Sequence, residues 1–174
     1  MTHFDRVGSD VEWEGNFLRA GVERFRLDDG AEVSRDKVWH VGAVGVLALD
    51  ERSVWLTRQP REVVGENASL EIPAGKLDVE GESPLQTGQR ELAEEIGKRA
   101  GSWEEILSFY TSPGFSDERV WLFLATDLAD AQGDPDEDER IEVVQWPLDR
   151  LRDAIEQTED AKTLVALLWL AARS

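Results

Sequence analysis

The sequence contains no cysteine and only two histidines, which excludes several kinds of site. Without cysteine, the chain forms no disulfide, offers no thiolate to a metal and has no cysteine nucleophile. The two histidines, His3 and His40, argue against a zinc site built from several imidazoles. A metal site in this chain would therefore have to rely mainly on oxygen ligands.

The chain also lacks a long apolar run and is poor in basic residues. Its longest apolar run, residues 164–172, is far shorter than the roughly 20 residues that span a bilayer. No basic patch followed by an apolar stretch opens the sequence, so we expect no signal peptide. With 19 Lys and Arg against 37 Asp and Glu, the net charge of -18 repels nucleic acid and anionic membranes. We expect a soluble, cytoplasmic protein with neither as a partner.

The length and composition indicate one folded domain with a small N-terminal addition. The chain has 174 residues, a hydrophobic fraction of 41% and seven tryptophans, which is enough for a packed core. No internal repeat or interdomain linker is visible. We expect residues 1–37 to form an N-terminal β segment and residues 38–174 to form the main domain.

The hydrophobic pattern predicts a mixture of strands and helices. Residues 11–36 indicate short strands with a hairpin turn at Asp28-Asp29-Gly30, and residues 38–49 a long β-rich run. Residues 59–69 are polar and predict a loop. Further strands are expected at 53–57, 103–110, 120–126 and 141–146, and closing helices at about 147–157 and 160–172. Mixed strands with helices at two places predict an α/β fold, an α/β/α sandwich with a mixed sheet.

A helix between residues 83 and 97 is the best-marked element. Ser83 is a natural N-cap, Gln86 completes a capping box, and Gly97 fits the position just after the last turn. The predicted buried stripe consists of Leu85, Leu92 and Ile96. Gly88 lies inside this helix and costs roughly 1 kcal/mol relative to alanine.

Three carboxylates lie on one face of that helix. Glu91, Glu94 and Glu95 stand at i, i+3 and i+4, so their Cβ atoms are roughly 5–6 Å apart. Like charges at this spacing oppose the helix by roughly 0.2–0.5 kcal/mol per pair, which a bound cation would offset. The plain alternative is a solvated helix face. Oxygen ligands favour Mg²⁺ first and Mn²⁺ second, and hence metal-assisted chemistry on a phosphate ester or anhydride.

The same segment resembles a known family motif. Gly75, Glu82 and the run 90–97 (RELAEEIG) resemble the Nudix box, G-x5-E-x7-R-E-U-x-E-E-x-G-U, where U is a bulky aliphatic residue. The match from Glu82 to Gly97 is in register. It departs from the motif in two places, because six residues separate Gly75 from Glu82 and Lys98 replaces the final aliphatic residue.

Segments outside the box resemble one branch of that family. Residues 71–78 (EIPAGKLD), residues 112–118 (SPGFSDE) and the strand pair before Val38 are similar to the corresponding parts of ADP-ribose pyrophosphatases. This resemblance implies a homodimer in which the N-terminal β segment contributes to the interface. The plain alternative for residues 112–118 is an ordinary Pro-Gly turn.

The resemblance also implies roles for individual residues. The metals would be held by Glu91, Glu94, Glu95, Glu139 and the backbone carbonyl of Ala74. The expected catalytic residues are Glu137, Glu94 and Arg90: Glu137, in the acidic segment 136–139, as the base, and Arg90 as the group that orients the glutamates, with a contact to Glu82. The expected substrate-binding residues are Arg61, Glu71, Gly114, Phe115, Ser116 and Glu118.

The expected function is Mg²⁺-dependent hydrolysis of the pyrophosphate bond of ADP-ribose or a related nucleoside diphosphate-sugar. ADP-ribose would give AMP and ribose 5-phosphate. One alternative keeps the chemistry and changes the substrate to a nucleoside triphosphate, a dinucleoside polyphosphate or another sugar nucleotide. A second alternative is a nucleotide sensor without catalysis, which the retained acidic positions and the lack of a basic helix-turn-helix segment disfavour.

Overall fold

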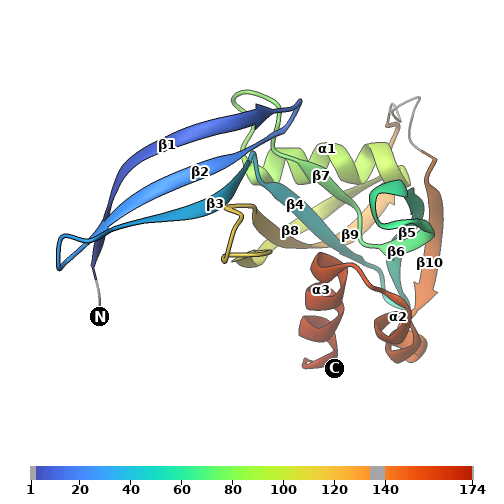
Figure 1. Ribbon diagram of the computed structural model, residues 1–174. Helices are drawn as coiled ribbons and strands as arrows, with labels where there is room; N and C mark the ends of the chain where they lie inside the picture. The colour runs from blue at the N-terminus through green and yellow to red at the C-terminus, as the bar shows by residue number, and fades with distance from the viewer. Residues whose placement is uncertain (1–2, 134–139, 174) are drawn as a thin grey trace. The chain divides into compact units, whose positions relative to one another are not determined.

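Three antiparallel strands build the N-terminal sheet: β1 (Phe4–Glu14), β2 (Leu18–Leu27) and β3 (Glu32–His40) (Figure 1). The predicted turn at Asp28-Asp29-Gly30 is confirmed, since the backbone N–H of Gly30 donates to the carbonyl of Leu27 and Gly30 has a φ of 84°. Positive φ is the conformation that glycine adopts without strain. This turn sets the register in which Arg26 pairs with Glu32.

The computed structural model describes residues 3–133 and 140–173, which form two compact units. The first unit comprises Met1–Gly42 and Phe109–Arg119, and the second comprises Ala43–Ser108 and Val120–Ser174. Within the first unit, β3 bonds to the 109–119 segment, because the N–H of Val38 donates to the carbonyl of Phe115 at 2.8 Å. The predicted domain boundary at residue 37 stays a prediction.

A mixed sheet forms the centre of the second unit. Its strands are β4 (Ala43–Leu49), β5 (Ser53–Arg61), β6 (Glu66–Glu71), β7 (Ala74–Lys76), β8 (Lys98–Tyr110), β9 (Arg119–Asp130) and β10 (Glu142–Pro147). The order is β10-β5-β4-β9-β8, with β6 paired to β5 and β7 paired to β4. β4 runs parallel to β9 and antiparallel to β5. The sheet is therefore mixed, as predicted.

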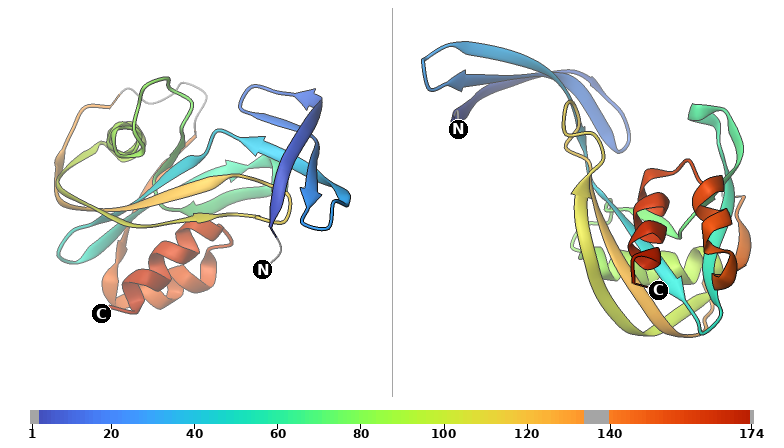
Figure 2. Two further views of the ribbon diagram at one scale, coloured as in Figure 1. Left: turned by 90° about the vertical axis from the view of Figure 1, so that its left-hand side faces the viewer. Right: turned by 90° about the horizontal axis from the view of Figure 1, so that it is seen from below.

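Helices cover both faces of this sheet. α1 (Pro84–Ile96) lies on one face, and α2 (Leu151–Gln157) and α3 (Ala161–Ala171) lie on the other (Figure 2). The α1 face is closed by a buried apolar cluster of Val46, Ala48, Leu92, Ile96 and Ala125. The α/β/α sandwich is confirmed. Within the described ranges, no helix has the length and apolar character that crossing a membrane requires.

The signals at the ends of α1 are confirmed. The backbone N–H of Ser83 donates to Gln86 Oε1 at 2.9 Å, and the N–H of Gln86 donates to Ser83 Oγ at 3.3 Å, which completes the capping box. Gly97 ends the helix with a φ of 64°. Leu85 is only partly buried. Gly88 is buried instead, and a Cβ there would lie 3.3 Å from Val44, so this glycine permits close packing on β4.

The loop predicted over residues 59–69 is wrong. β5 continues to Arg61 and β6 begins at Glu66, so only residues 62–65 form the connection, with Gly65 at a φ of 74°. The backbones pair from Thr57↔Glu71 to Arg61↔Glu66. The first half of β6 is exposed and polar, which makes an edge strand look like a loop in the sequence. The β-rich run 38–49 is likewise interrupted: β3 ends at His40 and β4 begins at Ala43, and Gly42 between them has a φ of 93°.

Candidate metal and substrate site

The acidic face of α1 lies against the short segment that precedes the helix. The backbone N–H of Ala74 donates to Glu95 Oε2 at 3.1 Å, and Glu95 is buried. A Cβ on residue 75 would stand 1.9 Å from Glu91 Oε1, so Gly75 is required by the position of the Glu91 carboxylate. The first glycine of the motif therefore makes room for one of its glutamates.

Arg90 faces three of the carboxylates. Its Nη1 atom lies 2.9 Å from Glu91 Oε1 and 2.7 Å from Glu94 Oε2, and its Nε atom lies 3.4 Å from Glu82 Oε1. Burial opposes the charged form of Arg90, but Glu91, Glu94 and Glu82 outweigh it and raise the pKa of the guanidinium. Arg90 therefore stays protonated and holds the carboxylates in place by charge-assisted hydrogen bonds.

The two departures from the motif are accommodated locally. The additional residue before Glu82 falls in a turn in which the N–H of Glu82 donates to the carbonyl of Val79, and Gly81 has a φ of 87°. Lys98 places its ammonium 2.6 Å from Asp130 Oδ1 and 4.5 Å from the centre of the Trp55 ring. Its aliphatic stem can thus replace a bulky aliphatic residue while the charged end finds partners.

The predicted metal ligands fit a hard divalent cation. Ala74, Glu91, Glu94 and Glu95 come from two adjoining segments and offer carboxylate and carbonyl oxygens. One guanidinium is set against several carboxylates here, so the cluster keeps an excess of negative charge. Within residues 3–133 and 140–173, no three His, Asp or Glu side chains are gathered closely enough to hold a metal ion. Glu91 and Glu94 are each bonded to Arg90 instead.

The acidic segment assigned to catalysis lies outside the described residues, and so do Glu137 and Glu139. The described chain before it ends at Gly133, which packs on α1. A Cβ on Gly133 would lie 2.0 Å from the carbonyl oxygen of Ala93 and 2.7 Å from the Cα atom of Glu94. The N–H of Ala131 donates to the carbonyl of Gly97. The chain that enters the acidic segment is thus tied to the helix that carries the glutamates.

A second cluster of charges joins Arg61 to Glu71. Arg61 Nε and Nη2 each donate to a different oxygen of Glu71 at 2.7 Å, which is a bidentate pair. The Glu71 side chain is 2% exposed and that of Arg61 is 43% exposed. The bond to Glu71 raises the pKa of Arg61, burial opposes this shift, and the charges of Asp160 and Glu95 add to it. Arg61 is therefore within electrostatic reach of the acidic helix.

The sequence interpretation missed a third member of this cluster, Lys162. Its ammonium donates to Glu71 Oε2 at 2.6 Å and to Asp160 Oδ1 at 2.9 Å. Asp160 caps α3 by accepting a bond from the N–H of Thr163. A helix start at Asp160 could have been recognised in the sequence. That Lys162 faces Glu71, 91 residues away, depends on the tertiary structure.

The predicted substrate residues of the 112–118 loop belong to the first unit. Gly114, Phe115 and Ser116 line a cavity of about 430 Å³. Its wall also includes two aromatic residues of the N-terminal sheet, Phe4 and Phe25. Glu118 is not among the lining residues and accepts a bond from Thr111 Oγ1 at 2.7 Å.

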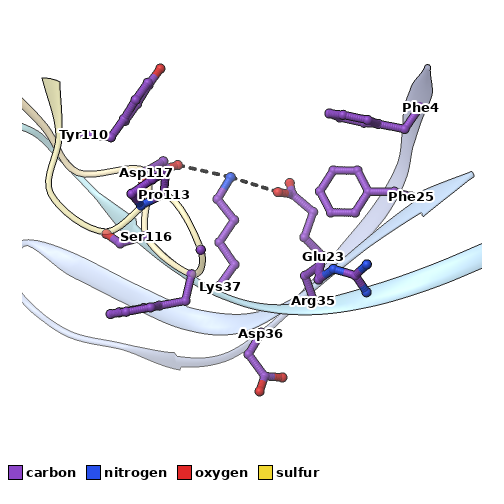
Figure 3. A pocket seen from close by; sticks show the side chains of 12 residues that line it. Phe4, Glu23, Phe25, Arg35, Asp36, Lys37, Tyr110, Pro113, Ser116 and Asp117 are labelled. Carbon is purple, nitrogen blue, oxygen red and sulfur yellow. Dashed lines mark hydrogen bonds and ion pairs between the residues drawn. The ribbon is translucent and has the colours of Figure 1, made fainter. Parts of the chain in front are cut away.

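Lys37 is the central charge of that cavity (Figure 3). Its ammonium lies 2.8 Å from Glu23 Oε2 and 3.1 Å from Asp117 Oδ2. Burial lowers the pKa of Lys37, but Glu23 and Asp117 outweigh it and raise the pKa. The cavity therefore combines exposed aromatic rings with an ammonium that is paired with two carboxylates.

We predict that Glu71 makes stability depend on acid pH. Burial alone would raise the pKa of Glu71, but Arg61 and Lys162 outweigh it and lower the pKa from 4.5 to about 2. A lowered pKa contributes stability above pH 4.5 that is lost as the pH falls towards about 2, up to about 3 kcal/mol in total. In urea denaturation at pH 7, the wild type should have a larger free energy of unfolding than Glu71→Gln. This difference should become smaller as the pH falls below 4.5. A gap independent of pH would contradict this.

Comparison with protein families gives a match over most of the chain. Residues 39–168 match the model of the NUDIX domain. A solved structure described as an ADP compounds hydrolase superposes with a TM-score of 0.83, covering 97% of this chain and 92% of that one, at 20% identity. At that identity the superposition supports the fold alone.

Similar sequences with assigned names cover nearly the whole chain. An ADP-ribose pyrophosphatase of Bacillus subtilis is 41% identical over 94% of this chain and 90% of its own length. A methanol dehydrogenase activator of Bacillus methanolicus is 36% identical over the same shares. An ADP-ribose pyrophosphatase of Mycobacterium tuberculosis is 38% identical over 72% of this chain and 60% of its own length. With the motif built on α1 and the domain match across residues 39–168, the chain belongs to the Nudix hydrolase family.

Proposed function

We propose that this Nudix hydrolase cleaves the pyrophosphate bond of ADP-ribose or a related nucleoside diphosphate-sugar in a Mg²⁺-dependent reaction. The products would be AMP and a sugar phosphate. The observation that carries the proposal is the acidic face of α1, where Arg90 gathers Glu82, Glu91 and Glu94. The similarity to ADP-ribose pyrophosphatases over nearly the whole chain supports the choice of substrate.

The residues of the acidic face would hold the cation and keep it in place. Glu91, Glu94, Glu95 and the carbonyl of Ala74 supply the oxygen ligands, and the bond from Ala74 N–H to Glu95 fixes the two segments to each other. When bound, Mg²⁺ supplies charge neutralisation at the pyrophosphate oxygens and lowers the pKa of water. Arg90 keeps Glu91 and Glu94 aligned through its charged hydrogen bonds.

The substrate would contact Arg61 and the loop at residues 112–118. Arg61 is oriented by its bidentate bond to Glu71 and remains 43% exposed, so its guanidinium can face a phosphate. We assign Gly114, Phe115 and Ser116 to substrate contact because they line a cavity with aromatic walls, and Glu118 because it follows them in the same loop.

The acidic segment before β10 would supply the base. We propose that Glu137 accepts the proton of the attacking water and that Glu139 is a further metal ligand. Glu137→Gln should lower kcat by roughly 10²–10⁴-fold, since the amide cannot accept a proton. Glu142→Gln, at the start of β10, is the matched control and should keep its activity. A wild-type kcat in Glu137→Gln would contradict the assignment.

The substrate is tested by product release from a panel, with Mg²⁺ and with EDTA. The panel holds ADP-ribose, ADP-glucose, GDP-mannose, NADH, diadenosine polyphosphates and dGTP. We expect metal-dependent turnover with the highest kcat/KM for ADP-ribose, and its loss in Glu95→Gln. If metal-dependent turnover has its highest kcat/KM for another compound, the proposed reaction stands and the proposed substrate is wrong. Nucleotide binding without any turnover would indicate a sensor.

We further propose that the protein is a homodimer joined through its N-terminal sheet. Large apolar side chains in the first unit are exposed: Phe4, Val7, Val11, Trp13, Phe17 and Val41. Exposed apolar side chains in such number are typical of an interaction surface. Sedimentation velocity should give twice the 19.6 kDa of one chain. Trp13→Glu should shift the protein towards monomer and Val64→Glu, on an exposed turn of the second unit, should not. A monomeric wild type would contradict the proposal.

A further inference from the structure

Thr158, just before α3, and two residues in the first turn of α3 bind three consecutive residues at the end of β6: Leu70, Glu71 and Ile72. Thr158 Oγ1 donates to the carbonyl of Leu70 at 2.8 Å, and the N–H of Ile72 donates to Thr163 Oγ1 at 2.8 Å. Between them, Lys162 bonds to Glu71 at 2.6 Å. All these contacts come from residues 158–163. Ala74, a proposed metal ligand, follows Ile72 by two residues.

Lys162 contributes the charge in this arrangement. Its side chain is 14% exposed, and its ammonium lies between the carboxylates of Glu71 and Asp160. Asp160 is held in turn by bonds from both the N–H and the hydroxyl of Thr163. The position of the ammonium is therefore set by the cap of α3 and does not depend on a flexible side chain alone.

Lys162 offsets one of the carboxylate charges that surround Arg61. Arg61 and Lys162 face Glu71 and Asp160, so two cations meet two carboxylates. Without Lys162, the Arg61 guanidinium would be outnumbered by carboxylates, with Glu95 of the acidic face adding to them. An anionic pyrophosphate would then approach a cluster of net negative charge.

We propose that Lys162 is a positioning residue for substrate binding, which acts through Glu71 on Arg61. It satisfies Glu71 Oε2 together with Arg61, so that the carboxylate keeps the orientation in which Arg61 is bound at both donors. It also cancels a carboxylate charge beside the exposed guanidinium. This inference rests on the proposed role of Arg61 in binding the substrate phosphates.

The test compares steady-state kinetics of the full chain with the preferred substrate of the panel and Mg²⁺. Lys162→Met should raise KM by about tenfold or more and change kcat much less, because ground-state binding is lost. Lys162→Arg keeps the charge, so its KM should stay close to that of the wild type. A fall of kcat by about tenfold with an unchanged KM would overturn the proposal.

Lys98→Met is the matched control. Lys98 is 18% exposed and also pairs with a carboxylate, that of Asp130, so the substitution removes the same charge from a similarly covered position. Because the motif has an aliphatic residue there, KM should stay close to wild type. A KM raised as much in Lys98→Met as in Lys162→Met would show that net charge alone is responsible and would overturn the proposal.

A double-mutant cycle with Arg61→Ala tests whether Lys162 affects KM through Arg61 or acts on the substrate directly. If Lys162 acts through Arg61, Lys162→Met should change KM less than about twofold once Arg61 is alanine. A full effect in that background would mean that Lys162 acts on the substrate directly, which overturns the proposal. If Arg61→Ala itself leaves KM unchanged, the proposed role of Arg61 fails. If the wild type turns over no compound of the panel, the proposed function fails.

Stability is followed in parallel, because removing Lys162 leaves Glu71 and Asp160 with less charge compensation. Asp160→Asn with Lys162→Met removes one carboxylate together with the ammonium, and asparagine is also a good N-cap. This double variant should unfold at a higher urea concentration than Lys162→Met. Its KM should lie between that of Lys162→Met and that of the wild type. A KM no better than that of Lys162→Met would contradict the electrostatic part of the proposal.

Discussion

The guanidinium of Arg90 holds together the acidic face of α1. Arg90 contacts Glu82, Glu91 and Glu94, and without a cation at this position three carboxylates would repel one another on and beside the same helix. The same contacts leave the cluster with more negative than positive charge. This excess of negative charge is what the proposed Mg²⁺ would neutralise, so the same imbalance that opposes the fold locally favours a divalent cation.

The segment Leu70–Gly75 transmits this constraint to the rest of the second unit. On one side it is bonded to Thr158, at the end of α2, and to the first turn of α3, and on the other the N–H of Ala74 is bonded to Glu95 on α1. These two helices lie on opposite faces of the sheet (Figure 2). The segment therefore links the acidic face and the Arg61 cluster along one short stretch of backbone.

Local signals in the sequence predicted the parts of the site that depend on local structure. The capping box at Ser83 and the glycine at position 97 placed α1 correctly, and the spacing of the glutamates along it follows from helix geometry alone. Where tertiary context decides, the prediction failed or was absent. The polar sequence 59–69 pairs as an edge hairpin because β5 provides a partner, and Lys162 meets Glu71 only after α3 docks on the sheet.

Lys98 fills a motif position that is otherwise aliphatic. The motif position calls for apolar volume, and the stem of a lysine provides it when an aromatic ring and a carboxylate receive the charged end, as Trp55 and Asp130 do here. Gly75 and Gly133 illustrate the opposite case, in which no side chain fits: one stands against the carboxylate of Glu91 and the other against the backbone of Ala93. A motif position filled by volume tolerates exchange when the polar end of the new side chain finds partners. A side chain at residue 75 would instead have to displace the Glu91 carboxylate, so Gly75 constrains the position of that carboxylate more directly than the residue at position 98 does.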